Sequence, residues 1–260
     1  MRHLARITLA VDSLGLAWPA AAQSRRSPTV DDLLNLVQVS GAEISPDGRQ
    51  VIYSRSEITR WSDNKRVSSI WIANADGTDH RPLLGSDKDR SPVWSPDGRA
   101  IAFLSTRDQA ENAKDAPGAQ IWVLPATGVG EATKLTEHKT AIRAIKWSGD
   151  SRQLFFTADE EDPQKDARKN SLGDGIFVDE EANGQGRGSF SNLWVISVAD
   201  KQVRRLTSGA NLIGDFVPSP DASRVAYTSR PNNRRNQQNL AEVFVVTTAA
   251  STPVQLTKNE

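Results

Sequence analysis

The chain has 260 residues, and its 32 Lys and Arg residues balance 32 Asp and Glu residues to a formal net charge of zero. This balance argues against a general nucleic-acid binder, which carries a basic surface. The sequence has no cysteine and only three histidines, His3, His80 and His138, which excludes disulfide scaffolds and cysteine metal sites. We therefore expect no metal site and no cofactor in a chain long enough to bury a sizeable core.

Residues 1–22 are typical of a secretory signal peptide. Arg2, His3 and Arg6 give a positive start, residues 7–16 are mostly apolar, and Ala20–Ala22 supply small residues at the cleavage point. The alternative is a disordered N-terminal tail. No other apolar run approaches the roughly 18 residues that span a bilayer. We expect a secreted or bacterial periplasmic protein without a membrane span.

A leader, 23–41, follows the signal and contains a predicted helix over residues 29–38. Thr29 is placed to cap it, and Asp31 and Asp32 fall in the first turn, where carboxylates favour a helix.

A four-residue phrase then recurs four times. It reads Ser45-Pro46-Asp47-Gly48, Ser95-Pro96-Asp97-Gly98, Ser148-Gly149-Asp150-Ser151 and Ser219-Pro220-Asp221-Ala222. Asp caps a turn with its carboxylate and Gly takes a positive φ at little cost. These residues therefore indicate turn chemistry rather than an active site. The two copies with Ser151 or Ala222 in place of the final Gly predict wider or more strained turns.

Each phrase belongs to a unit with four predicted strands. An alternating apolar strand follows the phrase, then an aromatic strand such as Ile121-Trp122-Val123, then a Leu-Thr strand such as Leu135-Thr136. One further short strand precedes the phrase. Units of this size, about 40 to 70 residues, are typical of propeller blades. We predict an all-β fold, a partial β-propeller over 42–257 with blades at about 42–84, 92–136, 143–207 and 214–257.

The third unit is longer because it holds a polar insertion, 158–191. Asp159, Glu160 and Glu161 begin it, and an acidic pair, Glu180-Glu181, lies inside it. Such a segment is typical of a surface excursion. His80 and His138 fall near an outer hairpin and a connector, where surface histidines are usual, so a metal or carbohydrate site has little support.

The helix, the repeated phrase and the acidic insertion resemble the N-terminal β-propeller of the prolyl oligopeptidase family of serine peptidases, in its acylaminoacyl-peptidase and dipeptidyl-peptidase-like branch. The resemblance covers about 30–257. It implies a propeller that covers an active site and admits short peptides, followed by an α/β-hydrolase domain with a Ser-Asp-His triad.

This chain departs from the family in carrying no Gly-x-Ser-x-Gly motif. We therefore assign no catalytic residue, and expect a substrate-gating portion that does not hydrolyse peptides by itself and that is truncated before a missing C-terminal catalytic domain. The alternative is a TolB-like periplasmic protein-interaction propeller, which shares the repeat.

The resemblance also suggests one substrate contact. Dipeptidyl-peptidase relatives hold the amino terminus of the substrate with paired propeller glutamates, so Glu180 and Glu181 are candidate substrate-binding residues, although acidic loops are usually only solvated. An unclosed ring leaves two blade faces uncovered, and we expect poor solubility or self-association through them.

Overall fold

The computed structural model describes residues 26–60, 65–110, 116–126, 130–161, 190–230 and 239–259. The predicted signal, 1–22, lies outside them. Two compact units divide the chain, Met1–Asn35 and Leu36–Glu260. In the first, α1 (Val30–Leu34) begins with a capping box, in which Thr29 and Asp32 each accept a hydrogen bond from the other's backbone N–H. The helix is shorter than the predicted 29–38, because the chain is already extended at Gln38.

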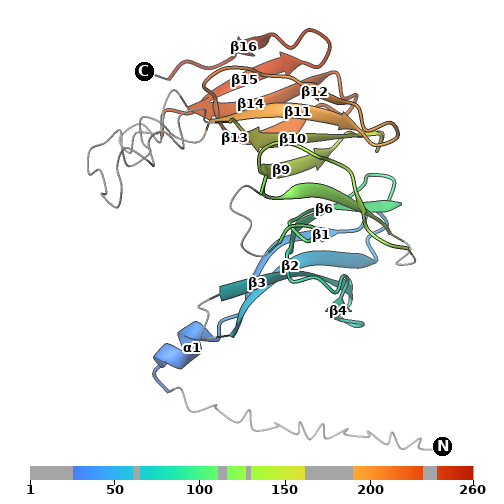
Figure 1. Ribbon diagram of the computed structural model, residues 1–260, viewed down its shortest axis with the longest axis vertical. Helices are drawn as coiled ribbons and strands as arrows, with labels where there is room; N and C mark the ends of the chain where they lie inside the picture. Colours follow the sequence, from blue (N-terminus) through green and yellow to red (C-terminus); the bar gives the residue numbers. More distant parts are fainter. Residues whose placement is uncertain are drawn as a thin grey trace, which may run out of the picture. The chain divides into compact units, whose positions relative to one another are not determined.

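The second unit is built from four-stranded antiparallel sheets, which we call blades 1 to 4 and which can be followed by colour in Figure 1. Blade 1 contains β1 (Gln38–Ile44), β2 (Gln50–Arg60), β3 (Lys65–Asn74) and β4 (Arg81–Pro82). Blade 2 contains β5 (Asp89–Trp94), β6 (Ala100–Ser105), β7 (Gln120–Pro125) and β8 (Thr133–Lys134). Blade 3 contains β9 (Ile142–Trp147), β10 (Gln153–Asp159), β11 (Ser191–Ser197) and β12 (Val203–Arg205). Blade 4 contains β13 (Leu212–Pro218), β14 (Arg224–Arg230), β15 (Glu242–Thr247) and β16 (Pro253–Gln255).

The first strand of each later blade contacts the preceding blade. β5 contacts β1, β2 and β3, β9 contacts β5, β6 and β7, and β13 contacts β9 and β11. A parallel pairing of Ser191 with Leu212 also joins blades 3 and 4 into one eight-stranded sheet. The prediction of an all-β chain of repeated four-stranded sheets is confirmed.

The repeated phrase forms the turn between the first and second strands of every blade. In blade 2 the Ser95 hydroxyl donates to Asp97 Oδ1 at 2.6 Å and accepts from the backbone N–H of Ala100 at 2.9 Å. Asp97 Oδ1 also accepts from the N–H of Arg99 at 3.1 Å. The other three turns repeat these bonds. The serine hydroxyl, followed by the backbone donor, lowers the pKa of each turn aspartate, that of Asp221 to about 2.

Contacts between successive turns explain why the third phrase is degenerate. The N–H of Asp97 donates to the hydroxyl of Ser151 in the next blade at 3.0 Å. A Cβ added to Gly149 would lie 2.4 Å from the carbonyl oxygen of Pro220. Blade 3 therefore has Gly where the other phrases have Pro, because the turn of blade 4 approaches its backbone too closely for a side chain.

The two phrases without Gly at the fourth position keep the left-handed backbone that Gly adopts there in the other two. Ser151 and Ala222 have φ of 61° and 57°, against 74° and 70° at Gly48 and Gly98. The predicted strain is present, since left-handed backbone costs a residue with a Cβ about 1–2 kcal/mol, but these turns are not wider because they make the same hydrogen bonds.

At the fourth position of the phrase, gaining a Gly and losing a Gly should change the free energy of unfolding in opposite directions. We expect Ala222→Gly to raise the free energy of unfolding by up to about 1 kcal/mol, because relief of left-handed strain exceeds the added entropy of unfolded Gly. Gly48→Ala should lower it by about 1 kcal/mol, although open space surrounds its added Cβ. Urea unfolding of both variants measures this, and changes of the same sign would contradict the account.

The Leu-Thr pairs lie just after the fourth strand of blades 2, 3 and 4 rather than within a strand, where the sequence predicted them. They carry a second repeated set of hydrogen bonds, which closes the edge of the third strand. The Thr136 hydroxyl accepts from the N–H of Ile121 at 2.9 Å and donates to Gln120 Oε1 at 3.0 Å. Thr207 and Thr257 make the same pair of bonds in blades 3 and 4. Threonine therefore recurs because its hydroxyl satisfies a backbone donor and a side-chain acceptor at once.

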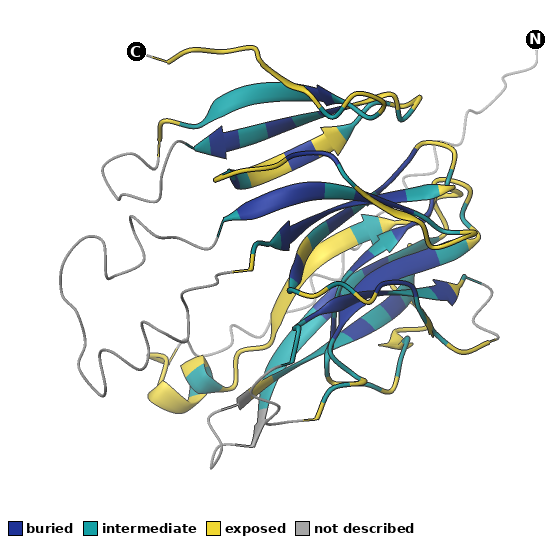
Figure 2. Ribbon diagram, turned by 45° about the horizontal axis from the view of Figure 1, so that its top comes forward, coloured by how far each residue is buried: buried dark blue, intermediate teal, exposed yellow. Residues whose placement is uncertain are grey.

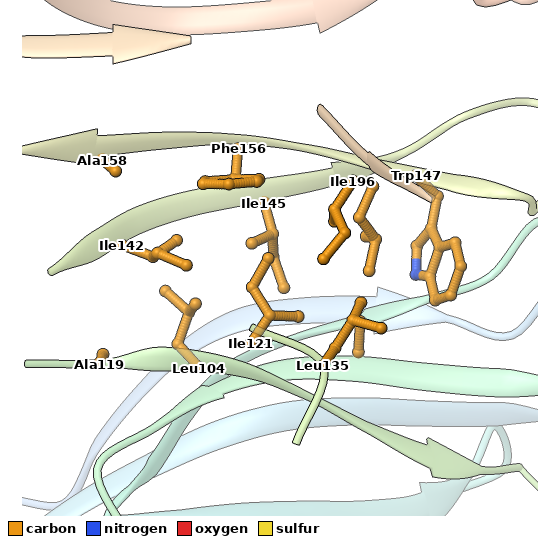
Figure 3. Packing of buried hydrophobic residues seen from close by; sticks show 12 residues of the cluster. Leu104, Ala119, Ile121, Leu135, Ile142, Ile145, Trp147, Phe156, Ala158 and Ile196 are labelled. Carbon is orange, nitrogen blue, oxygen red and sulfur yellow. The ribbon is translucent and has the colours of Figure 1, made fainter. Parts of the chain in front are cut away.

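Blade 3 is buried on both faces, as the doubly apolar strands predict (Figure 2). On one face Phe156 and Ile145 pack with Leu104 and Ile121 of blade 2, in the cluster drawn in Figure 3. On the other face Phe155 packs with Phe216 and Tyr227 of blade 4, in a separate cluster. The sheets thus stabilise one another through apolar burial between blades.

Candidate functional site

A cavity of about 790 Å³ lies where blade 2 passes into blade 3. Part of its wall is the connector, residues 135–140, which joins β8 to β9. The rest comes from Lys134 of β8, Phe156 and Asp159 of β10, the residues after β10, Trp194 of β11, Lys201 between β11 and β12, and both ends of β12. The volume is within the range of small-molecule sites.

Three rings form the apolar wall of the cavity. Phe156 and Trp194 are paired across β10 and β11, and their rings stack with centroids 6.4 Å apart. His138 meets both edge-on, at 5.8 Å from Phe156 and 4.9 Å from Trp194. The half-buried imidazole therefore extends the aromatic surface from blade 3 onto the connector.

The arginine on this wall repeats a feature of other blades. The Arg205 guanidinium lies 5.3 Å from the centre of the Trp194 ring, as Arg107 lies 5.2 Å from Trp122 in blade 2. Within the described residues the indole nitrogens of Trp194 and Trp122 are both buried without a hydrogen-bond partner. Cation–π stacking on the blade tryptophan is thus a structural feature shared between blades. A histidine ring also meets the tryptophan of blade 1, where His80 lies 4.6 Å from Trp71, but His138 is the one that lines this cavity.

The polar rim of the cavity is held by ion pairs and hydrogen bonds. Glu160 accepts from Asn192 Nδ2 at 2.7 Å and from the Arg205 guanidinium at 2.8 Å. Arg143 holds both carboxylate oxygens of Asp159. The lining residues include four cationic and four anionic side chains: Lys134, Lys139, Lys201 and Arg205, and Glu137, Asp159, Glu160 and Glu161. An aromatic wall with a balanced rim suits a small ligand that is neutral or zwitterionic.

The lining does not contain an activated nucleophile of the kind that peptide hydrolysis needs. The Thr140 hydroxyl oxygen lies 3.1 Å from His138 Nδ1, but the same nitrogen also accepts from the backbone N–H of Thr140. The Thr140 hydroxyl donates to the carbonyl oxygen of Asp159. These are bonds of a local turn, and they fix the connector against the end of β10.

Protonation of His138 should weaken the fold. Burial, against smaller opposing effects of the Thr140 backbone, Glu160 and Glu161, lowers the pKa of His138 below 6.5. Because the folded state binds this proton less readily than the unfolded state, the stability that neutral His138 contributes is present above about pH 6.5 and is lost as pH falls below it. We expect NMR titration to give a pKa under 6.5, and His138→Asn to reduce the loss of stability between pH 7 and pH 5. A pKa above 6.5 would contradict this.

The residues that the sequence suggested for a site are placed as follows. Glu180 and Glu181 lie outside the described residues. His80 is exposed, in keeping with the expected surface position, and its ring lies tilted against Trp71 with ring centroids 4.6 Å apart. His138, expected at the surface, is instead half-buried in the cavity wall, because the connector folds back onto Trp194.

Among the described residues, no cluster of three or more His, Cys, Asp or Glu side chains is arranged to hold a metal ion. None of the helices in the same part of the chain has the length and apolar character required to cross a membrane.

Comparison with known proteins finds similarity both to peptidases and to TolB proteins. No family model matches the chain. It is 26% identical over 228 residues to the uncharacterized peptidase YuxL of Bacillus subtilis, covering 84% of this chain and 33% of YuxL. It is 29% identical over 173 residues to dipeptidyl-peptidase 5 of Porphyromonas endodontalis, covering 62% of this chain and 24% of that enzyme. The chain thus spans a quarter to a third of the length of these curated relatives.

A shorter match and two solved structures complete the comparison. The Tol-Pal system protein TolB of Alcanivorax borkumensis is 36% identical over 89 residues, which cover 34% of this chain and 19% of TolB. Acylaminoacyl peptidase of Pyrococcus horikoshii superposes with a TM-score of 0.60 at 18% identity, over 87% of this chain and 33% of that one. The β-propeller domain of the trilobed protease of Pyrococcus furiosus gives 0.54 at 17% identity, over 86% and 58%. These structures show that the fold is a β-propeller of four-stranded blades.

Proposed function

We propose that this chain is the propeller portion of an exported serine peptidase that acts on short peptides. One observation carries the proposal: peptidase relatives align over most of this chain and over only a minor part of their own length. The part of such an enzyme that corresponds to this chain is a propeller, which gates access, while an α/β-hydrolase domain outside residues 1–260 supplies the Ser-Asp-His triad.

The cavity at blade 3 fits this role as a contact surface. Its aromatic wall and charge-balanced rim suit a segment of peptide, whose backbone is polar and uncharged and whose termini carry opposite charges. Because the wall lacks an activated nucleophile, the chain by itself should bind or admit peptides without cleaving them.

A TolB-like interaction propeller is the second candidate. The match to TolB of Alcanivorax borkumensis favours it locally, since that match has the higher identity, 36%. It covers 34% of the chain, however, against 84% for YuxL, so the peptidase proposal accounts for more of the sequence.

Several expectations from the sequence stay predictions within this proposal. They are export through a signal at 1–22, the division into a leader at 23–41 and blades over 42–257, and substrate contact by Glu180 and Glu181. Self-association through apolar positions on the outer blades is another: Val39 and Ile44 of β1 are each 60% exposed, and Val217 of β13 is 55% exposed.

The coding sequence downstream of codon 260 tests the proposal directly. The peptidase reading predicts an in-frame continuation that encodes further blades and then a Gly-x-Ser-x-Gly elbow with Asp and His following in order. A stop codon at this point in the native gene, with no hydrolase domain encoded beside it, would favour the TolB-like candidate instead.

A further inference from the structure

Two arginines occupy the same repeat position in neighbouring blades. Arg90 of β5 and Arg143 of β9 each lie five residues before the serine of the repeated turn, at Ser95 and Ser148. The strands that carry them, β5 and β9, contact each other. Blades 1 and 4 have Ser40 and Gly214 at this position, so the two guanidinium groups are a feature of one blade junction.

Arg90 differs from the other charged residues of the first strands in having no partner. Among the described residues no hydrogen bond or ion pair is made by its side chain, although it is half-buried. Its neighbour Asp89 is fully buried and bound to Arg107. On the other first strands Glu43 accepts from the N–H of Trp94 at 2.9 Å, and Lys146 pairs with Asp215 at 3.1 Å.

Of the two guanidinium groups at the junction of blades 2 and 3, one has no counter-ion. Arg143 has its counter-ion in Asp159, which it holds through both oxygens, whereas Arg90 has none. Burial and, secondly, the charge of Arg143 lower the pKa of Arg90. A guanidinium nevertheless stays protonated in proteins. A half-buried charge without a partner opposes folding, so its presence calls for an explanation other than stability.

We propose that Arg90, with Arg143 beside it, forms a subsite for a carboxylate group at the junction of blades 2 and 3. The planar fork of a guanidinium matches a carboxylate through two parallel N–H···O bonds. The single excess charge suits a monoanion better than a phosphate dianion. The carboxylate is either the free C-terminus of a short peptide or an Asp or Glu side chain within one. The inference does not require the peptidase proposal, because binding is measured on this chain alone.

Binding of matched peptides separates the two sources. The probes are N-acetyl-trialanine with a free C-terminus, its C-terminal amide, and the amidated peptides N-acetyl-Ala-Glu-Ala and N-acetyl-Ala-Gln-Ala, measured calorimetrically with the full chain. We expect at least one carboxylate peptide to bind tenfold or more tightly than its uncharged counterpart. Preference for the free C-terminus identifies the terminal source, and preference for Glu over Gln identifies the side-chain source.

Substitutions then assign the preference to Arg90. Arg90→Gln should abolish it, and Arg90→Lys should weaken it severalfold by removing the fork while keeping the charge. Arg99→Gln is the matched control, since it removes the same charge from an exposed position in the turn of the same blade, and it should leave binding unchanged. A preference that is absent from the unaltered chain, or that survives Arg90→Gln, would overturn the proposal.

Thermal unfolding without peptide separates a binding arginine from a structural one. Because Arg90 has no partner to lose, Arg90→Gln should leave the melting temperature unchanged or raise it. A lowered melting temperature would show that Arg90 supports the fold and would count against the subsite. Competition by inorganic phosphate that exceeds competition by acetate at equal ionic strength would also overturn the assignment to carboxylate.

Discussion

Asp89→Asn should lower the free energy of unfolding by about 3–5 kcal/mol, the cost of leaving one partner of a buried ion pair uncompensated. The Asp89 side chain is 0% exposed and that of Arg107 is 22% exposed. The guanidinium is fixed further by the ring of Phe103, whose centre is 5.0 Å away, and by Trp122. Asn keeps the shape of the side chain and removes its charge, so urea unfolding reports the loss of the pair.

Blade 1 offers a matched control for this variant. Arg55 lies over Trp71 at 4.6 Å and pairs with Glu57 at 2.9 Å, but the Glu57 side chain is 36% exposed. Solvent weakens such a pair, and Glu57→Gln should cost less than about 1 kcal/mol. If Asp89→Asn costs no more than Glu57→Gln, the buried pair does not hold blade 2. A double variant, Asp89→Asn with Arg107→Met, should recover part of the loss, because no charge then stays unpaired.

Phe155→Ala should cost about 3–5 kcal/mol, because it removes a fully buried aromatic ring and leaves a cavity. Phe155 is 0% exposed and belongs to the cluster that blade 3 shares with Phe216 and Tyr227 of blade 4. Blade 4 would lose part of its contact surface, so the urea transition should shift as a whole.

The matched control is Val254→Ala on β16, where the side chain is 59% exposed. We expect a change within about 0.5 kcal/mol, since surface substitutions away from the core have small effects. Equal losses for the two variants, or a loss under 1 kcal/mol for Phe155→Ala, would mean that blades 3 and 4 do not share a core.

The architecture was predictable because the repeat encodes local geometry. Ser45, Asp47 and their equivalents make bonds within six residues of chain, so the phrase alone specifies the turn. Phe155 and Phe156 point to opposite faces of a strand by simple alternation, so burial between blades followed from the pattern. The recurrence of Thr136, Thr207 and Thr257 was visible too, but their shared acceptor role needed the register of the third strand.

The candidate site was much less predictable, because it depends on how distant segments meet. The path of the connector brings His138 against Trp194, 56 positions later in the chain, and sequence alone does not fix that path. The sequence likewise offers no reason for Gly149 in place of Pro, because the reason is the close approach of Pro220 from the next blade. The repeat position of Arg90 could have been read from the sequence, but its lack of a counter-ion depends on Asp89 and Asp159 already being bound.

Labelling of the native protein with a fluorophosphonate, which reacts with activated serines, tests the central claim most directly. An antibody raised against the propeller would recover the protein from an extract of its source organism after labelling. The account predicts a labelled serine within a Gly-x-Ser-x-Gly sequence in the recovered material, identified by mass spectrometry, and no label on residues 1–260. Recovered protein without any labelled serine, in an extract where other serine hydrolases are labelled, would contradict the account.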